Sequence, residues 1–545
     1  MSRRWFRVLT ILCAGLAAHG GCLKAVFYLD DLWQIQDSEF VEGGRWWGEP
    51  SLMLTNLSYY LTWRLAGSSP VAFHAGNLML HLLTSLSVYW LARYLLAVRD
   101  QSRTDDWETI AWIAALIFAV HPLNTEVTHY ARARDHGLVG LWSFLAAGWM
   151  ALALRRNRLW GIAALLAVLL AAVSKGPGLP HALLSVALVV LAFSTRAGWR
   201  VFFANRPVAL ITTGVTAGAL WLVSGHLRFL FSSLVGGLTN EDFGPYALTQ
   251  CRVLPQYLWR MVLPVNLCSD HLFESTKDLL DPWAWVCAAG LLGFIIALAF
   301  AWIRGWRPWA LIIALGLGGL LLRWLYVVSE MMVEYRTYPT MPFVAMLLAG
   351  IICHWRRKQP RLGTAAVCVL LAGFGALAHR RSADWASRDA LHAQILRLYP
   401  LQLRAMNCLA QDDLREGRYG AILERHPEFV SRLGKVLAFT GNDPHRGYQS
   451  WPWWFVCEEC AVAEAIAHTS GPSIGRDYHN LTAWKMNEAQ FEHGAFWAEW
   501  HLSAGKIASL AGDLKGALRE LVQARQGYQS PIAIDREIRK ILPAY

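Results

Sequence analysis

Residues 282–303 have the sequence PWAWVCAAGLLGFIIALAFAWI, a run of apolar side chains without a charged residue. A helix that crosses the hydrocarbon core of a bilayer needs about 17–25 mostly apolar residues. Because backbone polar groups in hydrocarbon must pair within their own segment, we expect this run to be a helix. Similar runs recur from the N-terminus to about residue 378, so the sequence predicts a bundle of membrane helices.

The composition agrees with a membrane protein. Of the 545 residues, 55% are hydrophobic and 16% are charged, and a soluble domain usually has about a quarter charged residues. The net charge is +11, but much of the excess lies in short loops between apolar runs, as the positive-inside rule predicts. We therefore expect the partner of this basic chain to be membrane lipid and not nucleic acid.

We predict about 11 spans, because that number of apolar runs has the required length. With the basic loops in the cytoplasm, the N-terminus is cytoplasmic, and an odd number of spans places the C-terminus in the periplasm or the lumen of the endoplasmic reticulum. The predicted domains are a membrane domain, residues 1–378, and a soluble helical domain, residues 379–545. The predicted spans are centred near Gly15, Ser85, Ala115, Ala146, Leu166, Val186, Thr216, Leu292, Gly316, Leu347 and Leu371.

Most candidate catalytic residues lie in the predicted outer loops, and the first is the pair Asp30 and Asp31 after the first span. Two adjacent carboxylates at the end of a spanning helix are costly to bury. The neighbouring charge can raise the pKa of one carboxyl, which could then serve as a general base. The alternative is a solvated acid pair without a catalytic role.

A denser cluster of charged and polar residues precedes the fourth span. Arginine suits phosphate binding because its planar fork can bind two oxygens. The alternative is a set of side chains that snorkel to the membrane interface. The cluster consists of His121, Glu126, Arg132, Arg134 and Asp135.

Further candidates occur elsewhere in the chain. Lys175 joins two apolar runs at the outer boundary, and Glu334, Arg336 and Tyr338 precede the tenth span. A snorkelling lysine and a turn with internal ion pairs are the alternatives.

Two histidines, His74 and His81, lie at helical spacing in the second span. Polar side chains in membrane helices often only bond to neighbouring helices. The sequence identifies no certain cofactor and leaves open whether a divalent cation takes part, since the acids could be base or ligand. It also leaves open whether Cys457 and Cys460 form a disulfide, because the spacing does not decide this.

The order of these motifs resembles the membrane glycosyltransferases of the C superfamily. Closest in layout are the transmembrane-and-tetratricopeptide-repeat protein O-mannosyltransferases and their bacterial relatives. Gly176 stands where that family has an acid, and Asp135 directly follows Arg134 without the usual intervening residue. The similar segments are Asp30-Asp31, Phe73-His74 with Asn77 and His81, His121-Pro122 with Thr125 and Glu126, Ser174-Lys175, and Glu334-Tyr335-Arg336-Thr337-Tyr338.

The resemblance implies an inverting hexosyltransferase with an all-α membrane bundle. It would move mannose or a similar hexose from a polyprenyl-phosphate donor to an acceptor, most simply a protein hydroxyl, at the outer or lumenal face. Asp30 or Asp31 would be the base. The supporting pocket would consist of His74, His81, His121, Glu126, Asp135, Glu334 and Tyr338. The lipid phosphate would be bound by Arg132, Arg134, Lys175 and Arg336.

The C-terminal residues favour helical repeats. In residues 498–531, Gly505, Gly512, Ala517 and Leu521 have nearly the spacing of a 34-residue helical hairpin, the tetratricopeptide repeat. Residues 385–419 are a weaker second example, and residues 424–496 fit no repeat. Such repeats could present a polypeptide acceptor. Two other functions remain open: a ligase or polymerase of lipid-linked glycans, and a non-catalytic membrane scaffold that binds partners through the repeats.

Overall fold

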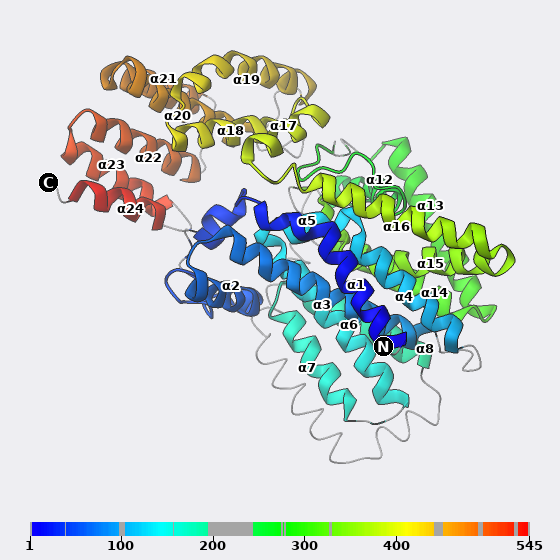
Figure 1. Cartoon of the computed structure of the whole chain (residues 1–545). Coiled ribbons are helices and arrows are strands. Elements are labelled where there is room, and N and C mark those ends of the chain that lie inside the picture. The colour runs from blue at the N-terminus through cyan, green and yellow to red at the C-terminus, as the bar shows by residue number, and fades with distance from the viewer. Residues whose placement is uncertain are drawn as a thin grey trace. The chain divides into compact units, whose positions relative to one another are not determined.

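The computed structural model shows helices and no strand in the residues that it describes (Figure 1). The described residues are 3–36, 38, 40–96, 104–155, 157, 159–193, 243–273, 276, 279–325, 330–440, 451–488, 494–527 and 532–542.

The chain divides into two compact units. The membrane unit consists of Met1–Asp31, Gly44–Ser269 and Thr276–Ser387. The helical unit consists of Leu32–Gly43, Asp270–Ser275 and Arg388–Tyr545. The helical unit thus includes two short segments from within the sequence of the membrane part, one of which begins directly after the acidic pair.

The membrane unit is a bundle of helices, as the apolar runs predict. Ten of the eleven predicted span centres lie in these helices, and Thr216 lies outside the described residues. Helix α12 was not predicted as an element of its own, because its sequence is polar enough to resemble an outer loop. The helices are α1 (Arg3–His19), α3 (Pro70–Leu96), α4 (Thr104–Val120), α6 (Arg134–Arg155), α7 (Trp160–Ala172), α8 (Gly178–Phe193), α12 (Phe243–Val262), α13 (Pro282–Ile303), α14 (Arg307–Leu321), α15 (Met341–Lys358) and α16 (Pro360–Arg381).

Several of these helices can cross a membrane, so the protein is a multi-pass membrane protein. Among the described residues, five segments are long and apolar enough, and a sixth is a pair of helices, Asp106–Val120 and Pro122–His129, bent by 48°. Helices α7, α8 and α14 contain shorter apolar segments. The five segments are Arg3–Lys24, Pro70–Leu96, Ala131–Leu154, Pro282–Ile303 and Pro360–Arg381.

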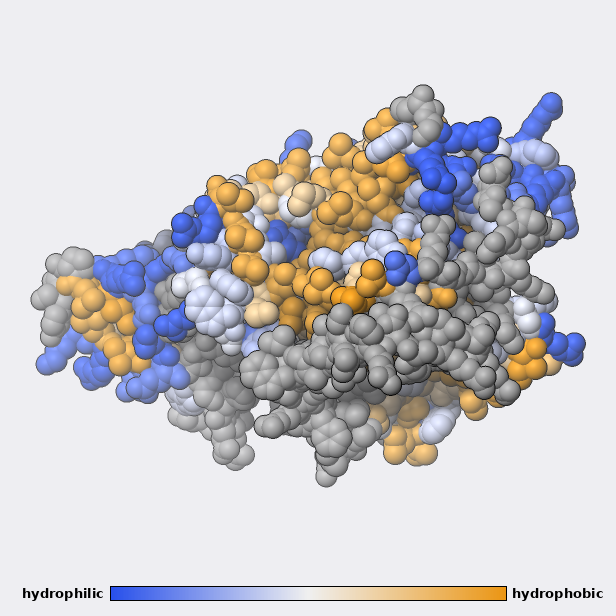
Figure 2. All heavy atoms as spheres, turned by 90° about the horizontal axis from the view of Figure 1, so that it is seen from below, coloured by the Kyte–Doolittle hydropathy of each residue, from blue (hydrophilic) through white to orange (hydrophobic). Residues whose placement is uncertain are grey.

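The surface of the protein also fits a lipid environment. Figure 2 shows broad apolar areas beside hydrophilic ones on one face of the molecule. In α13, the most apolar window has no residue that the described part of the chain buries. Its exposed side chains include Val286, Ile296 and Ile303. Because hydrocarbon tails are as apolar as these side chains, lipid can cover them without cost.

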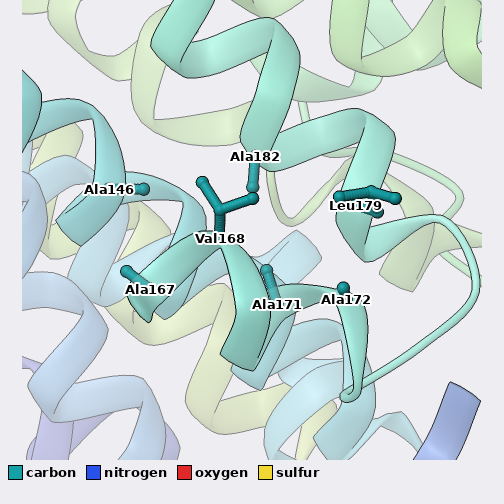
Figure 3. Packing of buried hydrophobic residues seen from close by; sticks show 7 residues of the cluster. All are labelled: Ala146, Ala167, Val168, Ala171, Ala172, Leu179 and Ala182. Atoms are coloured by element: carbon teal, nitrogen blue, oxygen red, sulfur yellow. The ribbon is translucent and has the colours of Figure 1, made fainter. Parts of the chain in front are cut away.

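Helices α6, α7 and α8 pack around small side chains (Figure 3). Alanine side chains let helix backbones approach closely, which is how membrane helices gain dispersion energy. This packing positions the connection between α7 and α8, which carries Lys175. The cluster consists of Ala146, Ala167, Val168, Ala171, Ala172, Leu179 and Ala182.

The helical unit contains the predicted repeat. Helices α22 (Gly494–Leu510) and α23 (Leu514–Gly527) form a hairpin. A Cβ atom on Gly505 would lie 2.8 Å from Cγ of Leu521, so the glycine permits the close packing of the two helices. Gly512, with φ +77, forms the turn between them, a conformation that favours glycine.

The rest of the helical unit is helical as well. The weaker predicted repeat forms two successive helices, and the segment that fits no repeat also forms helices. They are α17 (Arg388–Leu398), α18 (Leu403–Glu416), α19 (Tyr419–Thr440), α20 (Trp451–Ser470), α21 (Pro472–Glu488) and, after the hairpin, α24 (Ile532–Ile541).

Candidate functional site

The two carboxylates of the acidic pair have different environments. The Asp31 side chain is buried, and its Oδ1 accepts a hydrogen bond from the backbone N of Arg132 at 2.6 Å. Its Oδ2 accepts one from the backbone N of Tyr28 at 3.1 Å. Burial raises the pKa of the Asp31 carboxyl to about 8, and the neighbouring charge of Asp30 adds to this effect. Asp31 therefore joins two backbone segments and has little access to a substrate.

Asp30 is the member of the pair that reaches the surface. It is only half-buried, and its backbone N donates a hydrogen bond to Oη of Tyr130 at 3.2 Å. A tyrosine thus anchors the backbone of Asp30, a residue that stays partly exposed. Of the two acids, Asp30 is the one placed to exchange a proton with a bound molecule.

Beside the acidic pair, Asp135 binds two cations. Its buried Oδ2 lies 2.6 Å from Nζ of Lys175, and it also pairs with the guanidinium of Arg132. Its Oδ1 accepts a hydrogen bond from the backbone N of His136 at 2.6 Å. The Lys175 and Arg132 side chains remain 20% and 13% exposed. Two cations thus share one buried carboxylate, and the exposed parts of their side chains are placed to contact an anion.

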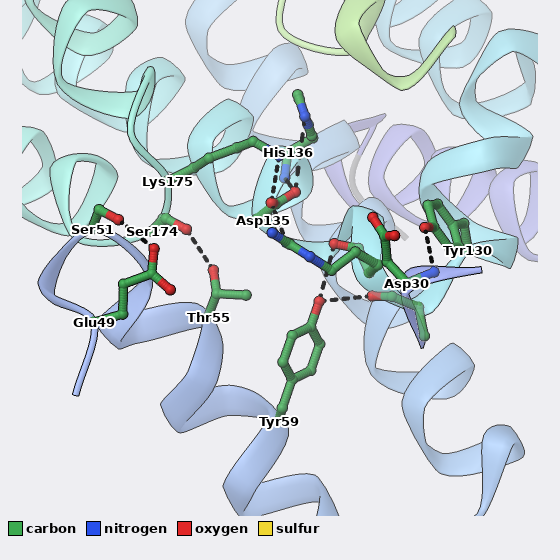
Figure 4. A network of polar contacts seen from close by, with 12 residues as sticks. Asp30, Glu49, Ser51, Thr55, Tyr59, Tyr130, Asp135, His136, Ser174 and Lys175 are labelled. Atoms are coloured by element: carbon green, nitrogen blue, oxygen red, sulfur yellow. Dashed lines mark hydrogen bonds and ion pairs between the residues drawn. The ribbon is translucent and has the colours of Figure 1, made fainter. Parts of the chain in front are cut away.

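Helix α2 (Met53–Ala66) braces both segments that carry these cations (Figure 4). Oγ1 of Thr55 donates a hydrogen bond to the backbone O of Ser174 at 2.6 Å. Oη of Tyr59 donates to the backbone O of Ala131 at 2.9 Å and of Arg132 at 3.1 Å.

The guanidinium of Arg134 has other partners than the guanidinium of Arg132. Its guanidinium is buried and donates to Oδ1 of Asn77 at 2.7 Å, the backbone O of Phe73 at 2.7 Å and Oγ1 of Thr62 at 3.1 Å. A Cβ atom on Gly76 would lie 2.8 Å from this guanidinium, so the glycine leaves room for it. Arg134 connects α2, α3 and α6, and its donors are occupied by the protein.

Two buried glutamates hold the η8 turn (Glu334–Thr337) in place. Oε2 of Glu126 accepts a hydrogen bond from the backbone N of Tyr335 at 2.7 Å. Glu334 accepts one from the backbone N of Cys268 at 2.6 Å, and it lies 2.7 Å from a guanidinium nitrogen of Arg381. These predicted site residues thus position a turn and are not exposed to a substrate.

The last predicted cation lies apart from Asp135. The nearly buried guanidinium of Arg336 donates to the backbone O of Glu330 and lies 3.5 Å from its carboxylate. The structure therefore brings together Arg132 and Lys175 among the four predicted phosphate ligands. Arg134 and Arg336 have their own partners.

The predicted histidines lie inside the bundle. Nδ1 of His81 is 3.0 Å from Oη of Tyr338, and its Nε2 is 3.1 Å from the backbone O of Ala119. Nε2 of His121 lies 3.1 Å from the backbone O of Met261 in α12. These contacts connect helices, as polar side chains in membrane bundles often do. His74 is also buried.

An aromatic residue lies next to the cations: Tyr335, which the sequence places in the motif before the tenth span without indicating a role for it. Nζ of Lys175 lies 5.6 Å from the ring centroid of Tyr335. That ring is 4.5 Å from the His136 ring and 6.4 Å from the Tyr130 ring, measured between centroids. Tyr335 occupies an unspecified position between the Glu334 and Arg336 of the motif, so the motif alone does not predict its contact with Lys175.

Two questions left open by the sequence can be addressed in the described part of the chain. There, no group of three or more His, Cys, Asp or Glu side chains could hold a metal ion. Cys457 and Cys460 are buried free thiols on α20.

Comparisons with known proteins support the resemblance. No protein-family model matches the chain, and no solved structure matches it. The chain is 24% identical to the Caenorhabditis elegans protein O-mannosyl-transferase F38B6.6 over 315 residues, which are 53% of this chain and 43% of that protein. Over 133 residues, 21% of this chain, it is 31% identical to mouse and 30% identical to human protein O-mannosyl-transferase TMTC1.

The matches with TMTC1 cover 13% of the mouse protein and 14% of the human protein. Each match therefore spans less than half the length of the curated relative. The resemblance predicted from the order of the motifs is confirmed: the chain is similar to proteins named protein O-mannosyl-transferases.

Proposed function

We propose that the protein is an inverting membrane glycosyltransferase of the C superfamily type. It transfers mannose or a similar hexose from a polyprenyl-phosphate donor to a protein hydroxyl. One observation carries the proposal: the partly exposed residue Asp30 lies in the same network of polar contacts as two partly exposed cations, Arg132 and Lys175. Asp31, the neighbour of Asp30, connects the acidic pair to the cations, because its carboxylate accepts a hydrogen bond from the backbone N of Arg132. The names of the relatives support the same activity.

In the proposed reaction, the carboxylate of Asp30 accepts the proton of the acceptor hydroxyl. The hydroxyl oxygen forms a bond to C1 of the hexose, and the bond between C1 and the phosphate oxygen breaks. Attack opposite the leaving group inverts the configuration at C1. The polyprenyl phosphate leaves with its charge stabilised by Arg132 and Lys175, which the protein holds in place before the reaction. Asp31 is a positioning residue, because it acts through the backbone of Arg132.

The orientation follows from the charges of the loops. The basic loops lie in the cytoplasm, and the acidic pair lies at the outer face of a bacterial inner membrane or at the lumenal face of the endoplasmic reticulum. The helical domain then lies in the periplasm or lumen, where its repeats present a polypeptide acceptor. Membrane lipid surrounds the helices of residues 1–378.

The test is sugar transfer by the purified protein in lipid. Radiolabelled polyprenyl-phosphate monosaccharides and oligosaccharides are offered as donors, with extracted cell protein as the acceptor. Native protein, Asp30→Asn and Asp389→Asn are compared, since Asp389 is an exposed acid of α17 far along the chain. Label in protein from a monosaccharide donor, lost only in Asp30→Asn, is the expected result.

Two other results would replace the proposal. Transfer from oligosaccharide donors alone would identify a ligase or polymerase of lipid-linked glycans. The absence of transfer from every donor, with native unfolding temperature, would favour a scaffold that binds partners through its helical repeats.

A further inference from the structure

Tyr335 lies close to one cation of the proposed site and to the residue that anchors the proposed base. The Lys175 ammonium is 5.6 Å from the ring centroid of Tyr335. The ring of Tyr130 is 6.4 Å away, and its Oη accepts a hydrogen bond from the backbone N of Asp30. The Tyr335 ring is therefore near both the phosphate-binding side of the proposed site and the segment that carries Asp30.

The backbone of Tyr335 is held firmly. Its N donates a 2.7 Å hydrogen bond to the buried carboxylate of Glu126. The preceding Glu334 is tied to Arg381 and to the backbone of Cys268. Buried charged groups with partners on three segments give this turn little freedom, so its aromatic ring has a defined place.

Tyr335 is also the accessible member of a group of aromatic side chains. Tyr28, Tyr130 and Trp385 pack around one another at centroid distances of 6.0 to 6.2 Å and are buried. Tyr335 contacts this group through Tyr130 and is only half-buried. The buried rings support it from behind, and a bound molecule could touch its accessible part.

The chemistry of transfer requires the hexose to occupy this region. C1 must lie between the base and the leaving phosphate, so the sugar ring lies between Asp30 and the cations Lys175 and Arg132. An aromatic ring offers a flat apolar surface of low conformational entropy, and the C–H face of a hexose is apolar. We propose that Tyr335 contacts the hexose of the donor and distinguishes the sugar-bearing lipid from the sugar-free one.

This inference rests on the proposed function and names the part of the donor that Tyr335 recognises. The test measures direct binding of two ligands to the purified protein in lipid: polyprenyl phosphate, and the same lipid carrying mannose. In Tyr335→Leu we expect affinity for the mannosylated lipid to fall on the order of tenfold. Affinity for the sugar-free lipid should stay the same, because Arg132 and Lys175 hold the phosphate.

The matched variants separate recognition from structure. Tyr335→Phe keeps the ring and should bind both lipids as the native protein does. Lys175→Met should lower the affinity of the protein for both lipids. If Tyr335→Leu lowers the unfolding temperature, Tyr335→Met replaces it, because methionine fills a similar space without a ring.

An equal loss of affinity for both lipids in the Tyr335 variants would mean that the ring only shields the Lys175 pair, and would overturn the inference. Unchanged affinity for both lipids would overturn it as well. The failure of the proposed function is a separate result: native protein would then bind neither lipid, or bind the mannosylated lipid and transfer nothing.

Discussion

Asp30 and Asp31 are adjacent and identical in type, yet the fold separates their roles. The carboxylate of Asp31 accepts two backbone hydrogen bonds and is buried, whereas Asp30 is half-buried. The sequence left open which of them is the base. Only the fold, which brings Arg132 to Asp31 across about a hundred residues of chain, distinguishes them.

Replacing Asp30 by Asn should therefore abolish most transfer. Loss of a general base typically costs on the order of 10²- to 10⁴-fold in rate. Asp31→Asn should lower the rate less than Asp30→Asn does, because the amide oxygen can still accept one of the two backbone hydrogen bonds. Initial rates of hexose transfer measure both effects, at equal unfolding temperatures. A larger loss in Asp31→Asn than in Asp30→Asn would contradict the assignment.

Asp31 should also make stability depend on pH. Burial raises the pKa of its carboxyl to about 8, and an unfolded chain has an Asp pKa of about 3.9. Between these values the folded state binds the proton more tightly, so stability falls as the pH rises from about 4 to 8. The unfolding temperature of detergent-solubilised native protein should fall over this range, and that slope should weaken in Asp31→Asn. Asp389→Asn is the control and should keep the native slope.

At the scale of elements, the clearest agreement is the hairpin of α22 and α23. Gly505 follows the repeat spacing because it packs against Leu521 of the facing helix, and Gly512 follows it because it forms the turn. The turn η8 is the opposite case. Its four residues carry a recognisable motif, but their contacts with Glu126, Cys268 and Arg381 come from distant segments.

Adding a methyl group to the hairpin tests this packing. In Gly505→Ala the new Cβ would lie 2.8 Å from Cγ of Leu521, and overpacking typically costs about 1–3 kcal/mol. Gly434→Ala in α19 is the control, since no atom lies within 4 Å of its added Cβ. That change should stabilise the helix by about 0.5–1 kcal/mol. The unfolding temperatures of the two variants should shift in opposite directions. An unfolding temperature of Gly505→Ala equal to that of the native protein would show that the hairpin packs differently.

At the scale of the whole molecule, the helical unit includes two short segments from within the sequence of the membrane part, Leu32–Gly43 and Asp270–Ser275. Asp270, in the second segment, has a buried carboxylate that forms a bidentate ion pair with the guanidinium of Arg404 in α18. In the first segment, the carboxylate of Glu42 lies 2.8 Å from the guanidinium of Arg536 in α24. The fold of this unit therefore depends on residues far from its own sequence.

Asp270→Ala should destabilise the helical unit strongly. Breaking a buried ion pair by removing one partner typically costs about 3–5 kcal/mol, because the other charge loses its compensation. Glu537→Ala removes an exposed pair with Lys540 and should cost at most about 1 kcal/mol. Limited proteolysis of the full chain in denaturant, followed at sites in α17–α24, measures both. Equal resistance of the two variants would show that the Asp270 segment is not needed.

The sequence by itself determined the helical membrane bundle, the positions of ten of its helices and the resemblance to protein O-mannosyl-transferases. These follow from apolar run length, charge and local motif spacing, which are properties of short segments. The tertiary structure alone decided which acid is accessible, that Arg132 and not Arg134 joins Lys175, and that Tyr335 lies beside them. Those outcomes depend on burial and on contacts between residues tens to hundreds of positions apart, and no local pattern encodes them.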